Sequence, residues 1–136
     1  MKELPPITIL VPTYNEETVI YEKIKNISEM EYPINKIEVI VIDDHSIDQS
    51  VVMANKAIED FNLKGMILKN KKRIGVNACY NKGVNEAKYD YVLTSDADVA
   101  IHKEALKRAV KILIQLEDVG GVTARMVTVS SNITEA

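Results

Sequence analysis

The chain has 136 residues, 46% of them hydrophobic and 27% charged, which is typical of one globular domain with its own core. With a net charge of -3, nothing in the overall composition suggests a surface for nucleic acid or anionic membranes. The one cysteine, Cys79, excludes an internal disulfide and a cysteine-based zinc site and favours an intracellular compartment. No apolar run approaches the roughly 18 residues that span a bilayer, and residues 1–6 lack the apolar stretch of a signal peptide.

The first half of the chain predicts two strands and two helices. The first strand is a β-branched run that ends at Pro12, because proline cannot donate to a strand ladder. The second strand is almost continuously apolar, as expected of a parallel strand covered on both faces. In chain order we predict a strand at 7–11, a helix from Glu16 to about Met30, a strand at 37–42, and a helix that Ser46 or Asp48 caps and that carries apolar residues from Val51 to Phe61.

The second half continues the same alternation. In chain order we predict a short strand at 66–68, a weaker helix at 75–87 that contains Gly83, a strand at 91–94, a helix at 103–116 and a fifth strand at 122–129. Alternating strands and helices predict an α/β fold, a mostly parallel, Rossmann-like sheet with helices on both faces. In such sheets ligands bind beyond the carboxyl ends of the strands.

Two carboxylates, Asp96 and Asp98, follow the predicted strand at 91–94 with one small residue between them. Neighbouring like charges repel each other and resist desolvation, and a divalent cation relieves that repulsion. Hard carboxylate oxygens suit Mg²⁺ or Mn²⁺. The alternative is a solvated loop, in which Asp-x-Asp is common.

The other strand ends also carry unusual polar residues. They are Pro12-Thr13-Tyr14-Asn15-Glu16 after the first strand, Asp43-Asp44-His45-Ser46 after the second and Lys69-Asn70-Lys71-Lys72-Arg73 after the third. Each has a plainer interpretation: a helix start, a turn with an N-cap, or a solvated basic loop. Together on one sheet edge they predict a nucleoside diphosphate site, because an aromatic ring suits the base, carboxylates suit the ribose, and cations suit the diphosphate.

These motifs resemble those of the family 2 glycosyltransferases with the GT-A fold. The matching residues are Pro12-Thr13-Tyr14-Asn15-Glu16, then Ile40 to Asp48, then Asn81-Lys82-Gly83 with Ala87, and finally Ser95-Asp96-Ala97-Asp98. The resemblance extends from about Ile7 to Arg125 and implies transfer of a sugar from a nucleotide-diphosphate sugar, with UDP favoured. It also implies inversion at the anomeric carbon and dependence on Mn²⁺ or Mg²⁺.

The resemblance implies a role for each matching side chain. The roles are Pro12 and Tyr14 for the base, Glu16 for the ribose, either Asp43 or Asp44 for the base N–H, Arg73 or a neighbouring lysine for the diphosphate, Asp96 for the ribose and metal-bound water, and Asp98 for the metal. Two positions depart from the family pattern. Val76 rather than lysine follows Gly75, which moves the expected phosphate contact to Arg73 or Lys72, and His45 replaces the usual glycine, so a positive φ there would be mildly costly.

We expect residues 1–136 to form a single nucleotide-sugar-binding domain without the acceptor-binding part, with the general base beyond Ala136. Expected partners are the nucleotide-diphosphate sugar and an unknown glycan or lipid-linked acceptor, and no nucleic acid. Tyr32-Pro33 resembles the membrane-associated, polysaccharide-synthase-like branch, so the expected location is the cytoplasm or the cytoplasmic face of the membrane.

Two alternatives remain open for the function. One is a nucleotide-sugar-binding module without turnover. The other is a receiver-type phosphoacceptor domain, which has a similar length. Receiver domains carry acids after the first and third strands, whereas here they follow the second and fourth, so the receiver alternative is disfavoured.

Overall fold

The computed structural model describes residues 3–115, and these form an α/β fold. Its elements are β1 (Ile7–Thr13), α1 (Ile20–Ser28), the short 3-10 helix η1 (Ile34–Lys36), β2 (Ile37–Asp43), α2 (Ser50–Asp60), β3 (Lys64–Lys69), α3 (Val76–Glu86), β4 (Tyr91–Thr94) and α4 (Ala105–Gln115). All strands and helices predicted before residue 116 are therefore confirmed. The fifth strand predicted at 122–129 lies outside the described residues.

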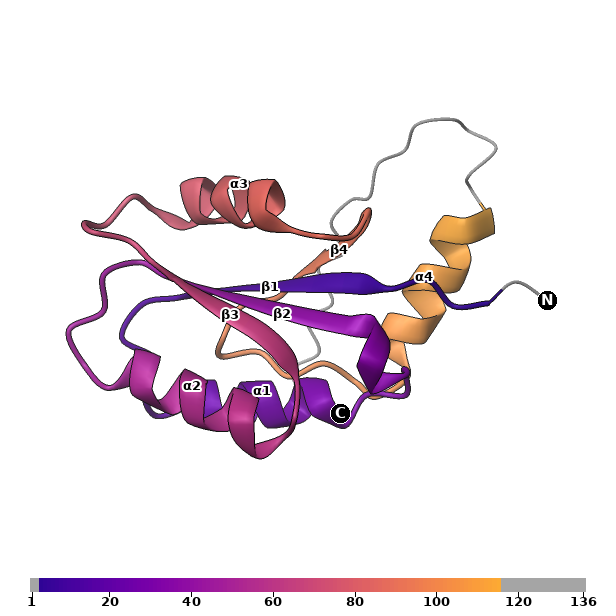
Figure 1. Ribbon diagram of the computed structural model, residues 1–136, viewed down its shortest axis with the longest axis horizontal. Coiled ribbons are helices and arrows are strands. Elements are labelled where there is room, and N and C mark those ends of the chain that lie inside the picture. Colours follow the sequence, from indigo (N-terminus) through magenta and orange to yellow (C-terminus); the bar gives the residue numbers. More distant parts are fainter. Residues whose placement is uncertain (1–2, 116–136) are drawn as a thin grey trace.

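The four described strands form one parallel sheet in the order β3-β2-β1-β4. Strand β1 pairs with β2 from Ile7 opposite Ile37 to Thr13 opposite Asp43, so both strands end at the same edge. After β3 the chain crosses through α3 to the other side of β1, where β4 pairs with it (Figure 1). Such a reversal of strand order opens a crevice at the carboxyl ends of the central strands.

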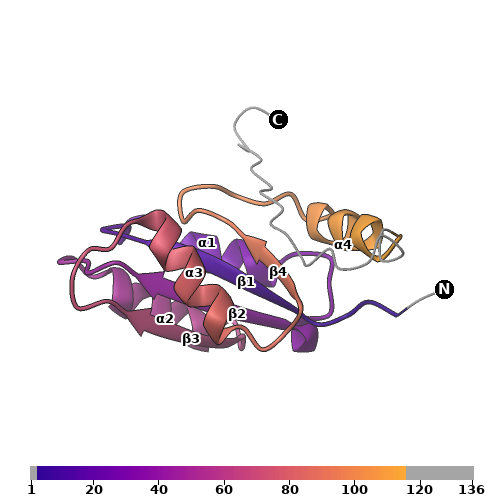
Figure 2. The same ribbon diagram turned by 90° about the horizontal axis from the view of Figure 1, so that it is seen from above.

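Helices cover both faces of the sheet, as predicted. Helices α1 and α2 lie on one face and α3 on the other (Figure 1). Because side chains alternate along a strand, Ile9 and Val11 pack into the cluster on the α1 and α2 side, whereas Leu10 packs with Cys79 of α3. Helix α4 lies towards the amino end of β1, away from the strand ends that face the crevice (Figure 2). In the part of the chain described, no helix is long and apolar enough to cross a membrane.

The start of α1 differs from the prediction, and the structure decides between the two predicted caps of α2. Helix α1 begins at Ile20 rather than at Glu16, because the chain first makes a turn in which the Glu16 carbonyl accepts hydrogen bonds from Val19 N and Ile20 N at 3.0 and 2.9 Å. Of the two predicted caps for α2, Asp48 accepts a 2.9 Å hydrogen bond from Ser50 N, the first residue of the helix. The other candidate, Ser46, instead accepts a hydrogen bond from Asn15 N in the loop after β1.

Gly83 lies inside α3 because the helix passes very close to the sheet. A Cβ at this position would stand 2.9 Å from Leu10 Cδ2 and 3.0 Å from Ile42 Cδ1, both in fully buried side chains. The low helix propensity of glycine is therefore offset by close packing of α3 on β1 and β2.

We expect Gly83→Val to lower the free energy of unfolding by about 1–3 kcal/mol, the usual cost of overpacking a core. Urea denaturation of the purified variant measures this. Asn85→Val, at an exposed position of the same helix, is the matched control and should change stability much less. An unchanged Gly83→Val midpoint would mean that Leu10 and Ile42 can move aside at little cost.

Candidate functional site

The four strand ends form one cleft at the carboxyl edge of the sheet. Its volume is about 200 Å³, and its lining comprises Pro12, Thr13, Tyr14, Glu16, Asp44, Arg73, Val76, Cys79, Asp96, Ala97 and Asp98. Of the side chains predicted for the site, all except Asp43 line this cleft. Residues up to 86 positions apart in the chain are thus brought together by the parallel register of the strands.

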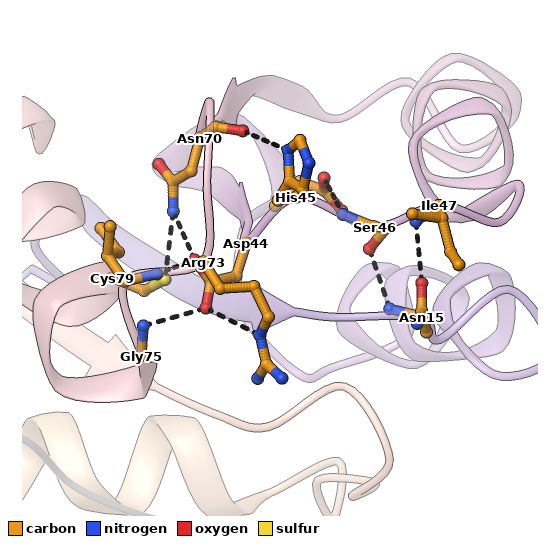
Figure 3. Close-up of polar contacts among 11 residues, drawn as sticks. Asn15, Asp44, His45, Ser46, Ile47, Asn70, Arg73, Gly75 and Cys79 are labelled. Atoms are coloured by element: carbon orange, nitrogen blue, oxygen red, sulfur yellow. Dashed lines mark hydrogen bonds and ion pairs between the residues drawn. The ribbon is translucent and has the colours of Figure 1, made fainter.

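Asp44 is held rigidly at the wall of the cleft (Figure 3). Its Oδ1 accepts hydrogen bonds from Ile74 N at 2.8 Å and Asn70 Nδ2 at 3.0 Å. Its Oδ2 accepts one from Gly75 N at 3.0 Å and lies 3.7 Å from Arg73 Nε. Burial by itself raises the pKa of Asp44, but these hydrogen bonds and the guanidinium outweigh it and hold the pKa below its usual range. Asp44 is therefore a fixed, ionised acceptor.

The neighbouring acid, Asp43, has a different role. Its Oδ2 accepts a 3.0 Å hydrogen bond from Ser46 N, which closes the turn after β2. Its Oδ1 is buried and has no hydrogen-bond partner among the described residues. The turn places His45 at φ 71°, the conformation in which a residue other than glycine carries a mild cost. Asp43 thus shapes the loop beneath the cleft and does not line it.

Arg73 lies flat against Tyr14. The guanidinium carbon is 3.6 Å from the centroid of the Tyr14 ring, a cation–π contact. One face of the ring is therefore covered, and a base that stacks on Tyr14 must use the opposite face or displace Arg73. Lys71 and Lys72 are exposed and do not line the cleft, so Arg73 is the cation of this loop that reaches it.

The loop that carries Tyr14 is attached to the loop after β2. Asn15 N donates to Ser46 Oγ at 2.8 Å, and Ile47 N donates to Asn15 Oδ1 at 2.9 Å (Figure 3). Glu16 N donates to Ser50 Oγ at 2.7 Å. These reciprocal contacts set the position of Tyr14 and Glu16 relative to Asp44. The sequence gives no sign of these contacts, because a serine in a turn does not show which distant loop it binds.

Two acidic side chains, Asp96 and Asp98, line the cleft after β4, on the opposite side of β1 from β2. The pKa of Glu16 is raised, first by burial and then by the charges of Asp98, Asp48 and Asp96. Tyr80, on α3, donates a 2.9 Å hydrogen bond to Asp96 Oδ1, and burial, followed by this bond, raises the pKa of Tyr80 to about 12. Nothing in the sequence had indicated this tyrosine.

The acid pair suits a divalent cation only in part. Within residues 3–115, no group of three or more His, Cys, Asp or Glu side chains is placed to hold a metal ion. Asp96 and Asp98 are both exposed at the cleft and supply hard carboxylate oxygens. Mg²⁺ and Mn²⁺ require about six oxygen ligands, and substrate phosphates commonly supply several of them. The donor set therefore fits a cation shared with a diphosphate rather than one enclosed by protein.

Lys23 was also missed. It is buried on the inner face of α1, where its ammonium donates to Ser95 Oγ and to the Val99 carbonyl. Burial lowers the pKa of Lys23 to about 8, although Asp96 and Asp98 oppose this shift. The signal was a lysine among Ile20, Ile24 and Ile27 at helical spacing, a position that predicts a buried side chain.

Comparison with known proteins places the chain in a family. The family model described as Glycosyl transferase family 2 matches residues 8–134. A probable glycosyltransferase of Bacillus subtilis, YdaM, is 31% identical over 127 residues, which cover 92% of this chain and 30% of YdaM. Poly(ribitol-phosphate) beta-N-acetylglucosaminyltransferase TarS of Staphylococcus aureus is 34% identical over 102 residues, which cover 75% of this chain and 18% of TarS. The chain therefore spans less than a third of the length of these relatives.

Solved structures agree with the observed fold. The mannosyltransferase PcManGT from Pyrobaculum calidifontis, in complex with GDP-Man and Mn²⁺, has a TM-score of 0.77 and 34% identity, covering 80% of this chain and 32% of that chain. TarS 1–349 of S. aureus in complex with UDP has a TM-score of 0.73 and 29% identity, covering 81% of this chain and 32% of that chain. These similarities confirm the predicted GT-A type of α/β fold.

Proposed function

Because the chain belongs to glycosyl transferase family 2, we propose that it binds the donor of a sugar transfer, a nucleotide-diphosphate sugar with uracil favoured. The observation that carries this proposal is the cleft in which Tyr14, Asp44, Arg73 and the acid pair meet. The sheet order separates two kinds of chemistry: the fixed acceptor Asp44 follows β2 on one side of β1, and the exposed carboxylates Asp96 and Asp98 follow β4 on the other side. A nucleoside diphosphate has the same polarity, from a planar base to an anionic group that binds cations.

We assign the base N–H to Asp44 rather than to Asp43. Asp44 lines the cleft and is ionised, so it can only accept. Uracil and guanine each present a ring N–H between polar groups, whereas adenine has an unprotonated nitrogen there. The proposed site therefore disfavours ADP. Comparing UDP with GDP tests the choice of base more strictly than comparing UDP with ADP, since solved relatives include one complex with GDP-Man and one with UDP.

Beyond the end of β4, Asp98 and Asp96 would hold Mg²⁺ or Mn²⁺ together with the diphosphate. When bound, such a cation stabilises the negative charge of a departing diphosphate. Tyr80 fixes one oxygen of Asp96, which leaves Asp98 the less restrained of the two. The acceptor hydroxyl would attack the anomeric carbon from the side opposite the diphosphate, with inversion. Among the described residues, we assign no general base for this attack.

The test of the proposed function is calorimetry of the 136-residue chain with UDP, GDP and ADP, each with Mn²⁺. We expect UDP to bind most tightly and the chain alone to be a poor transferase. Equal or tighter binding of ADP would overturn the assignment of Asp44 to a base N–H. Tighter binding of GDP would replace uracil by guanine as the favoured base. Rapid sugar transfer to an added acceptor would show that a general base is present after all.

Replacing Tyr14 by leucine should weaken UDP binding by about 1 kcal/mol, the value of one aromatic contact. The apolar bulk remains and Tyr14 is only half-buried, so the melting temperature should change little. Calorimetry and thermal melting of the same sample measure both effects. Tyr89→Leu, a half-buried tyrosine outside the cleft lining, is the matched control. A sharply lower melting temperature with unchanged UDP affinity would show that the Tyr14 ring only supports the fold.

A further inference from the structure

The inner face of α1 carries two polar side chains that reach the segment bearing the acid pair. Lys23 is 3% exposed and lies beside the fully buried Ile24. Asn26 is half-buried on the same side of the helix. Burying an ammonium is costly unless hydrogen bonds compensate for the lost hydration. The hydrogen bonds of these two side chains therefore show which segment of the chain α1 holds in place.

Both side chains bind residues that bracket the acid pair. Lys23 donates to Ser95 Oγ, just before Asp96, and to the carbonyl of Val99, just after Asp98. Asn26 forms a two-way contact with the backbone of Ile101: its Nδ2 donates to the carbonyl at 2.8 Å and its Oδ1 accepts from the amide at 2.7 Å. Residues 95–101 are thereby fixed from one helix at three points.

Other contacts of the segment lie at its start and in the core. Ser95 N donates to Leu10 O at 3.0 Å, which continues the pairing of β4 with β1, and Val99 N donates to Asp96 O at 3.2 Å, which closes the turn of the acid pair. Tyr80 binds Asp96, and Ala97 and Ile101 pack in the core. Lys23 and Asn26 add hydrogen bonds from α1 to residues 72 to 76 positions away in the chain.

We propose that Lys23 and Asn26 are positioning residues that hold Asp96 and Asp98 in the geometry that binds a cation and diphosphate, an inference that rests on the proposed function. Neither side chain lines the cleft, so each acts through the loop. Small hard cations tolerate only small departures from their preferred geometry. Side chains that orient metal ligands typically contribute 10–100-fold to metal affinity.

A positioning role and an electrostatic role of Lys23 predict opposite changes in Mn²⁺-dependent UDP binding. An ammonium close to two carboxylates repels an incoming cation, so a purely electrostatic role predicts tighter Mn²⁺-dependent binding when the charge is removed. A positioning role predicts weaker binding, because the loop loses two anchors. Asn26 carries no charge, so its removal reports on position alone.

The experiment compares UDP affinity with and without Mn²⁺ in wild type, Asn26→Ala and Lys23→Met. The ratio of the two affinities is the manganese gain. We expect both variants to reduce this gain about tenfold or more, while UDP binding without metal changes less than twofold. Lys25→Met makes the same chemical change on the same helix and should keep the wild-type gain, because the hydrogen bonds from α1 to residues 95–101 in the described part of the chain come from Lys23 and Asn26.

A full manganese gain in both variants, with only a lower melting temperature, would overturn the inference and leave the proposed function intact. A larger gain in Lys23→Met would show that its ammonium acts through charge and would likewise overturn its positioning role. Asn26→Ala decides the matter if Lys23→Met does not fold. A wild-type chain without any manganese gain would instead overturn the proposed metal site, and the inference with it.

Discussion

Replacing Asp98 by asparagine should abolish the gain in UDP affinity that Mn²⁺ confers, and should affect metal-free binding much less. Asparagine keeps the shape and one oxygen but lacks the negative charge that holds a divalent cation beside a diphosphate. Asp96→Asn should weaken both modes of binding, because Asp96 is assigned to the ribose as well as to metal-bound water. Titration of UDP with and without Mn²⁺ measures both effects.

Neither substitution should destabilise the unliganded chain. After burial, the charges of Asp98 and Asp96 also raise the pKa of Glu16. Removing either charge therefore lowers the repulsion between Glu16 and the acid pair in the folded chain. Melting curves without nucleotide test this. Asp90→Asn, at an exposed acid just ahead of β4, is the control and should retain the full manganese gain. If manganese helps Asp98→Asn as much as wild type, the acid pair is a solvated loop rather than a metal site.

Asp44→Asn should lower both UDP affinity and stability. An asparagine offers one acceptor oxygen where Asp44 offers two, so the N–H of Ile74 or of Gly75 would face an amide NH₂. Loss of a hydrogen bond to a charged group costs about 1.5–3 kcal/mol, and loss of the charged acceptor should weaken UDP binding about tenfold or more. Urea denaturation and calorimetry measure the two losses.

The stability loss in Asp44→Asn should depend on pH. The folded protein holds the pKa of Asp44 below its ordinary value of 3.8. The carboxylate therefore contributes its full stability above pH 3.8, and this contribution disappears as the pH falls through the folded pKa. The difference in unfolding free energy between wild type and Asp44→Asn should accordingly be largest near neutral pH and shrink in acid.

Asp43→Asn is the matched control for Asp44. Its oxygen can still accept from Ser46 N, and the new amide would occupy the position of an oxygen that has no partner among the described residues. Stability should therefore change less than in Asp44→Asn, and UDP affinity should remain near that of wild type. The opposite order of UDP affinities would identify Asp43 as the acceptor for the base.

The pattern of the amino acids was enough to predict the sheet and the residues that gather at its edge. Strand and helix periods are local, so the continuous apolar run of β2 and the short run of β4 could be recognised without knowing their neighbours. Parallel strands also bring their carboxyl ends to one edge whatever the details of packing. For that reason Tyr14, Arg73 and Asp98 could be assigned to one site from their places after three different strands.

Only the tertiary structure decided how the side chains of that site are used. Asp43 and Asp44 are equivalent in the sequence, and they differ because backbone amides 30 and 31 positions away bind one of them. Gly83 looked like a weak point in a helix until its distance to Leu10 was known. The role of Lys23 was missed, because its partners Ser95 and Val99 lie 72 and 76 positions away in the chain. Hydrogen bonds and close packing between distant segments depend on a few tenths of an ångström, which no local period encodes.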